Sequence, residues 1–156
     1  MARGESVKVR KCRFYTADVD RVEHLVERVI IYSLRINPAS KKTPRSAVLR
    51  ALLQLGLRLA DTREIPLESP VEKSPLVLLS YRVSDEETTQ LERLCKKLVE
   101  RSPFGAEPEL AEVERRIVRL ALDEVQTRAS FPAFMLLVWA ASRFSSGNPD
   151  PIKSSA

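Results

Sequence analysis

Residues 7–30, VKVRKCRFYTADVDRVEHLVERVI, have the same order of apolar and polar positions as residues 76–99, LVLLSYRVSDEETTQLERLCKKLV, which begin 69 positions later. The correspondence continues without a gap into a further element, where Val48 corresponds to Ile117. A pattern that recurs at constant spacing indicates one supersecondary unit used twice, with each copy covering the apolar face of the other.

Each copy predicts a strand followed by two helices. β-forming residues begin each copy, and apolar residues at helical spacing follow them. Pro and Gly residues separate the helices. We expect strands at 7–14 and 76–83, and helices at about 16–34, 43–60, 84–99, 109–125 and 133–144.

Three of the expected helices begin with a capping signal. Thr16 or Asp18 is a candidate N-cap for the first helix, and Thr43 followed by Pro44 marks the start of the second. The segment that begins at Ser84, with Glu three residues later, is a capping box.

The predicted domains are 7–60 and 76–126 for the two copies, 61–75 for a Pro-rich linker, and 127–156 for a C-terminal helix with a disordered tail. A unit of 69 residues buries little surface alone, so we expect the copies to share one core. A single strand has no partner within its copy. We therefore expect a mainly α fold with one two-stranded antiparallel β-ribbon, a pseudo-twofold arrangement and a C-terminal apolar helix.

Two short motifs resemble the Arc/MetJ-type ribbon-helix-helix superfamily. Residues 43–52, TPRSAVLRAL, resemble the second-helix signature, and residues 82–86, RVSDE, resemble the junction between strand and first helix. The resemblance covers roughly residues 7–60 and 76–126, and it implies a tandem, single-chain protein that places a β-ribbon in the major groove of double-stranded DNA. Such tandem proteins are known among accessory proteins of plasmid transfer and regulators of mobile elements.

The resemblance also implies which side chains contact bases. Strand side chains alternate between two faces, so apolar residues facing inward leave a polar set facing outward: Lys11, Arg13, Ser80 and Arg82. Arg and Lys can bond guanine, and Ser can bond several base edges. Arg10 falls on the inward face, and we expect its head group to reach solvent. A register shifted by one residue would invert the outward set.

The second helix of each copy is expected to hold DNA phosphates at its N-terminus. In the first copy the residues suited to this contact are Lys41, Lys42, Thr43, Arg45 and Ser46. In the second copy Glu112 and Glu114 would repel phosphate, and only Arg115 and Arg116 could compensate. We therefore expect the first copy to bind the DNA backbone more strongly.

Composition agrees with a polyanion partner and argues against several other classes. The formal net charge is +5, and basic residues cluster near the start of the chain. The single histidine, His24, and the two separated cysteines, Cys12 and Cys95, argue against a catalytic or metal site, so we expect no enzyme activity, metal or cofactor. The longest apolar run is too short for a membrane span, and we expect a cytoplasmic protein.

The apolar C-terminal helix has two interpretations. Its large residues either cap the shared core or form a patch for self-association or a partner protein; they are Phe134, Leu137, Val138 and Trp139. The function expected overall is a sequence-specific transcriptional repressor or regulator of a mobile element. The alternatives are a relaxosome-type accessory factor in conjugative transfer and a protein-interaction module, such as an antitoxin or inhibitor.

Overall fold

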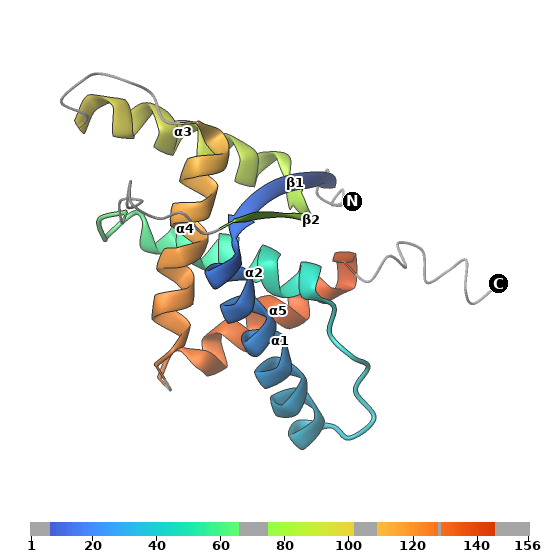
Figure 1. Ribbon diagram of the computed structural model, residues 1–156. Helices are drawn as coiled ribbons and strands as arrows, with labels where there is room; N and C mark the ends of the chain where they lie inside the picture. The colour runs from blue at the N-terminus through green and yellow to red at the C-terminus, as the bar shows by residue number, and fades with distance from the viewer. Residues whose placement is uncertain (1–6, 66–74, 102–108, 128, 146–156) are drawn as a thin grey trace, which may run out of the picture.

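The computed structural model describes residues 7–65, 75–101, 109–127 and 129–145, which form one two-stranded sheet and five helices. The elements along the chain are β1 (Val7–Tyr15), α1 (Thr16–Ile36), α2 (Arg45–Leu59), β2 (Leu76–Ser84), α3 (Asp85–Arg101), α4 (Leu110–Val125) and α5 (Phe131–Ser145), arranged as in Figure 1. The prediction of a mainly helical protein with one β-ribbon is confirmed.

The repeat seen in the sequence is also present in the secondary structure. Both strands and the starts of α1 and α3 are separated by the same 69 positions. The second helices depart from this spacing. α4 begins at Leu110, whose counterpart Lys41 lies before α2, so α4 has about one additional turn at its N-terminus.

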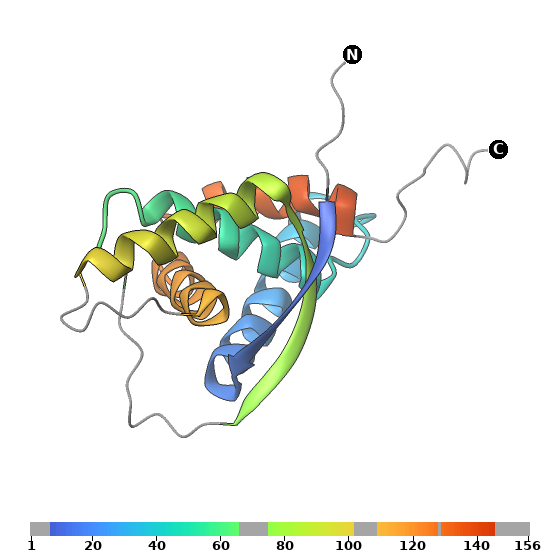
Figure 2. The same ribbon diagram turned by 90° about the horizontal axis from the view of Figure 1, so that it is seen from above.

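The two strands pair along their full length. β1 and β2 are antiparallel, with Lys11 opposite Ser80 at the middle of the ribbon. These two residues occupy the same position in the two copies, so the centre of the repeat coincides with the centre of the ribbon. Figure 2 shows the ribbon at one side of the molecule, with the helices gathered mostly on one face of it.

One continuous core lies beneath the ribbon. Both strands and all five helices contribute buried apolar residues to it, among them Phe14, Leu53, Leu91, Ile117 and Phe134. The second helices of the two copies cross closely at Gly56, where an added Cβ would lie 2.3 Å from the carbonyl oxygen of Ile117.

Two buried or partly buried ion pairs join the copies in equivalent ways. Arg50 Nε on α2 lies 3.3 Å from Glu87 Oε1 on α3, and Arg119 Nη2 on α4 lies 2.8 Å from Asp18 Oδ2 on α1. The two arginines are separated by 69 positions, and so are the two acids. Each pair therefore joins the second helix of one copy to the first helix of the other.

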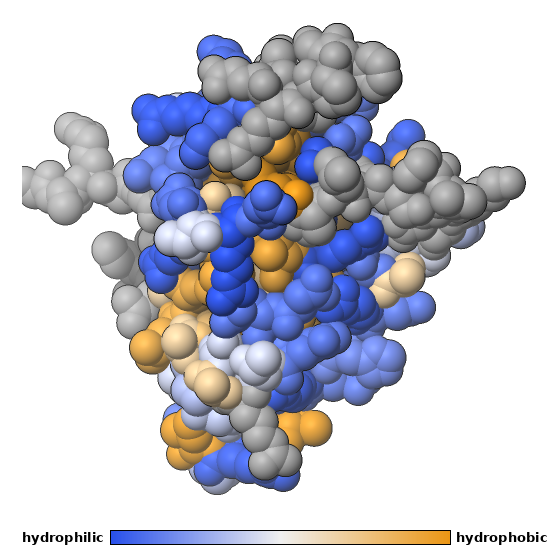
Figure 3. Space-filling model, turned by 90° about the vertical axis from the view of Figure 1, so that its left-hand side faces the viewer, coloured by the Kyte–Doolittle hydropathy of each residue, from blue (hydrophilic) through white to orange (hydrophobic). Residues whose placement is uncertain are grey.

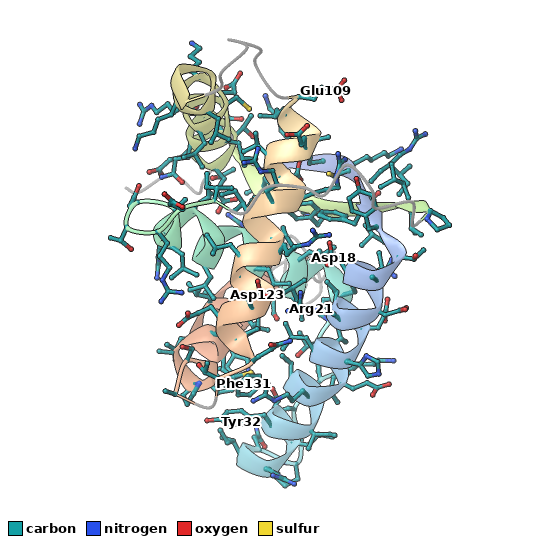
Figure 4. All side chains as sticks on the ribbon, turned by 60° about the vertical axis from the view of Figure 1, so that its left-hand side comes forward. Asp18, Arg21, Tyr32, Glu109, Asp123 and Phe131 are labelled. Atoms are coloured by element: carbon teal, nitrogen blue, oxygen red, sulfur yellow. The ribbon has the colours of Figure 1, made fainter. Side chains whose placement is uncertain are left out.

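Figure 4 shows further contacts of α1 with α4 and α5. Asp18 and Arg21 on α1 face α4, where Arg21 Nη2 lies 2.7 Å from Asp123 Oδ1. Further along α1, the rings of Tyr32 and Phe131 meet edge to face, with their centroids 5.3 Å apart. α1 is thus held to α4 by charged side chains near its start and to α5 by aromatic rings near its end.

The helix caps match the sequence prediction at one of three places. The capping box is confirmed, since Glu87 N donates to Ser84 Oγ and Ser84 N donates to Glu87 Oε1. The predicted caps of α1 and α2 are wrong: Tyr15 and Pro44 occupy the N-cap positions, and neither makes a side-chain capping bond. Asp18 is instead buried against α4, where a cation compensates its charge.

α5 packs on α2 and completes the core, as Figure 1 shows. Phe134 and Val138 are buried, so of the two interpretations the one that places them in an external patch does not hold for these residues. Leu137 and Trp139 are partly buried against the core, and Trp139 Nε1 donates a hydrogen bond to Ser33 Oγ. The interpretation of this helix as a cap on the core is the one that the burial favours.

Several expectations fall on residues outside the described ranges. They are most of the Pro-rich linker, the helix break at 103–108 and the tail from 146 onward. No helix within the described ranges is both long enough and apolar enough to cross a membrane. The face seen in Figure 3 carries mostly hydrophilic side chains, with separate hydrophobic areas between them.

Candidate nucleic-acid interface

The central part of the ribbon face directed away from the helices carries six side chains. On this face lie Val9, Lys11 and Arg13 of β1 and Leu78, Ser80 and Arg82 of β2. Arg82 is half-buried and the other five are exposed. The side chains that alternate with them are mainly buried, including Cys12, Phe14, Leu79, Tyr81 and Val83. The four predicted base contacts therefore lie together on the outward face.

The cross-strand pairs give this face a regular pattern. Val9 lies opposite Arg82, Lys11 opposite Ser80, and Arg13 opposite Leu78. The sequence interpretation omitted Val9 and Leu78, which are 61% and 52% exposed, because it assigned apolar residues to the core. Strict alternation from Lys11 along β1, and from Ser80 along β2, would have placed both on the outward face.

A buried polar cluster supports the ribbon from beneath. Glu114 on α4 is completely buried and accepts hydrogen bonds from Arg10 Nε and from the Tyr81 hydroxyl. Burial alone would lower the pKa of Arg10, but the charge of Glu114 raises it overall. Burial and then the charge of Glu114 raise the pKa of Tyr81, which stays a neutral donor.

This cluster corrects two predictions. Arg10 faces inward as expected, but its guanidinium binds Glu114 instead of reaching into solvent. Glu114 lies in the second turn of α4, beneath the ribbon, and its charge is compensated by Arg10. It is therefore not the exposed phosphate-repelling carboxylate that the sequence suggested.

The predicted phosphate contacts of the first copy lie just before α2 and in its first turn, and their side chains differ in exposure. Lys41 and Lys42 are exposed, and Ser46 is half-buried. Arg45 Nη1 lies 2.9 Å from Glu23 Oε1, in an exposed ion pair of the kind that contributes little stability. Thr43 is only 5% exposed, so its side chain offers little surface to a phosphate.

The start of α4 differs from the start of α2 in its charge and in the contacts of its arginines. Arg116 is 5% exposed, and its Nη1 lies 3.2 Å from Glu112 Oε2, so its guanidinium is directed to a carboxylate and offers little surface to a phosphate. Arg115 Nη1 donates to the carbonyl oxygen of Arg13 at the end of the ribbon. Figure 4 shows Glu109, the N-cap residue, at the ribbon end of α4.

No group of three His, Cys, Asp or Glu side chains among the described residues could hold a metal ion. Both cysteines are buried free thiols, as expected of small apolar residues, and burial raises the pKa of Cys12.

A scan of protein-family models found no match to this chain, and searches of curated proteins and of solved structures found none either.

Proposed function

We propose that this protein is a tandem ribbon-helix-helix protein that binds a specific sequence of double-stranded DNA through the β1–β2 ribbon. The observation that carries the proposal is the outward face of the ribbon, where Lys11, Arg13 and Arg82 accompany Ser80. This face has no helix of the described residues packed on it. The opposite face is buried on the helices, so the ribbon is a rigid support for these side chains.

The dimensions of the ribbon suit the major groove. The groove is about 12 Å wide and admits a two-stranded β-ribbon, and each base pair presents a distinct pattern of donors and acceptors there. Arginine and lysine pair with guanine O6 and N7, whereas serine is less selective. Sequence preference would therefore come mainly from Lys11, Arg13 and Arg82.

Backbone contacts would come from the ends of the second helices. Lys41 and Lys42 lie just before α2, where free backbone N–H groups also favour an anion. Within the described residues, the start of α4 offers Arg115, beside Glu109 and Glu112. The first copy would bind the DNA backbone more tightly than the second, as the charge pattern of the sequence already suggests.

The biological role we propose is a transcriptional repressor or regulator of a mobile element. A relaxosome-type accessory factor would bind DNA by the same ribbon and would differ in recruiting a transfer enzyme. A protein-interaction module, such as an antitoxin or inhibitor, would leave the basic face of the ribbon without a DNA partner.

A salt titration with four variants tests DNA binding. We expect saturable binding to a selected duplex, with affinity that falls steeply as salt rises. Lys11→Ala and Arg82→Ala should relax sequence preference, and Lys42→Ala should weaken all duplexes alike and reduce the salt slope by roughly one. Lys96→Ala, an exposed position on α3, removes the same charge away from the ribbon and serves as the control. Absence of saturable duplex binding by the folded protein would refute the proposal and favour the interaction module.

A further inference from the structure

The outward face of the ribbon combines charged and apolar side chains in a repeated way. Val9 and Leu78 are both more than half exposed, and they occupy the same position in the two copies. Arg13 and Arg82 are likewise counterparts. Single exposed apolar residues are common on protein surfaces, but here the same type recurs at equivalent sites.

Each apolar side chain also lies directly across from an arginine. Val9 of β1 faces Arg82 of β2, and Leu78 of β2 faces Arg13 of β1. Directly opposed Cβ atoms in an antiparallel pair are about 5 Å apart, so the two members of each pair can reach neighbouring bases. The pairs two positions to either side of the ribbon centre thus present the same combination of one guanidinium and one aliphatic group. The central pair joins a charged residue of one copy, Lys11, to a neutral residue of the other, Ser80.

We infer that the DNA site is an approximate inverted repeat, in which each half contains a guanine contacted by Arg13 or Arg82 and a neighbouring thymine whose methyl group contacts Leu78 or Val9. This inference rests on the proposed function. Guanine offers two acceptors to arginine in the major groove, and the thymine C5-methyl is the one apolar group that bases expose there. Binding of DNA would cover the exposed Val9 and Leu78 side chains.

The length of the ribbon limits the size of this site. At about 3.3 Å per residue, the distance from Val9 to Arg13 is about 13 Å, which corresponds to roughly four base-pair steps. The contacted segment is therefore about five base pairs long, with a central pair beneath Lys11 and Ser80.

The test begins with selection of duplexes from a random library by the full-length protein. Each conserved thymine of the selected site is then replaced by deoxyuracil, which removes only the methyl group. Affinity is measured by fluorescence anisotropy for the wild type, Val9→Ala and Leu78→Ala. We expect each replacement to weaken wild-type binding roughly fourfold, the effect of exposing about one methylene-sized group. The effect in one half should disappear in Val9→Ala, and the effect in the other half should disappear in Leu78→Ala.

The outcomes separate this inference from the proposed function. If duplexes are bound but the selected site has no inverted repeat, or if deoxyuracil changes nothing, the inference is overturned and DNA binding stands. If the uracil effect persists in both alanine variants, Val9 and Leu78 do not make the contact. If no duplex is selected at all, both the inference and the proposed function fail. The deoxyuracil measurement on the wild-type protein requires no variant to fold. It therefore shows by itself whether the thymine methyl groups contribute to binding.

Discussion

Replacing Arg10 with methionine is expected to destabilise the protein more than replacing its partner Glu114 with leucine. In the first variant, the fully buried carboxylate loses its cationic partner and keeps the neutral Tyr81 hydroxyl as a donor. In the second variant, the Arg10 guanidinium loses its partner, but its side chain is 21% exposed and can turn toward water. The two substitutions break the same ion pair, yet they leave different groups without compensation.

The magnitudes follow from this difference. Removing one partner of a buried ion pair costs about 3–5 kcal/mol of unfolding free energy, and we expect Arg10→Met to fall in this range. Glu114→Leu leaves the buried Tyr81 hydroxyl without its acceptor, which costs about 1–3 kcal/mol. The triple variant Arg10→Met, Tyr81→Phe, Glu114→Leu removes every polar group of the cluster. It should return to within about 2 kcal/mol of the wild type, because apolar replacements of buried ion pairs are often neutral.

Equilibrium urea denaturation, followed by circular dichroism, measures all three differences. Arg10→Lys keeps a positive charge near Glu114 and serves as a milder variant if Arg10→Met does not fold. A larger loss for Glu114→Leu than for Arg10→Met would refute the reasoning. So would a loss below about 1 kcal/mol for both single variants, because such a small cost is typical of solvent-exposed ion pairs.

Three further predictions concern stability. Gly56→Ala should lower the free energy of unfolding by about 1–3 kcal/mol in thermal denaturation, because the new Cβ would meet the backbone of Ile117; a stabilised variant would contradict the close helix crossing. Ser84→Ala should cost about 0.5–2 kcal/mol in urea through loss of the capping box, and no change would mean that the cap adds nothing. The hydrogen bond from Ser130 lowers the pKa of Glu124, so its contribution is present above pH 4.5 and lost as the pH falls through the lowered pKa. The stability difference between the wild type and Ser130→Ala should therefore shrink in acid, and a difference that stays constant down to pH 2 would exclude this linkage.

Local patterns were sufficient to predict the elements and the face of each strand. Alternation along β1 and β2 placed Lys11 and Ser80 outward, and helical spacing located the helices to within a few residues. The capping box at Ser84 was recognisable because both of its members lie within one turn. These features depend on neighbours in the chain, and the sequence displays such neighbours directly.

The errors concern polar residues whose partners are distant in the chain. Asp18 is a residue type that favours N-caps, but its partner Arg119 lies on α4, 101 positions away. Arg10 and Glu114 are 104 positions apart. The additional turn of α4 moves Glu114 from the helix start to a position beneath the ribbon. No local pattern contains this information, since it arises from how the copies pack.

The presence of β1 and β2 in one polypeptide has a consequence for assembly. A ribbon built from two separate chains dissociates on dilution, so its stability depends on protein concentration. Here the strands meet in an intramolecular reaction, and the thermal midpoint should not vary with concentration. Each polypeptide supplies one β1 and one β2, which are encoded separately in the same gene. A mutation can therefore change one strand of the ribbon and leave the other unchanged.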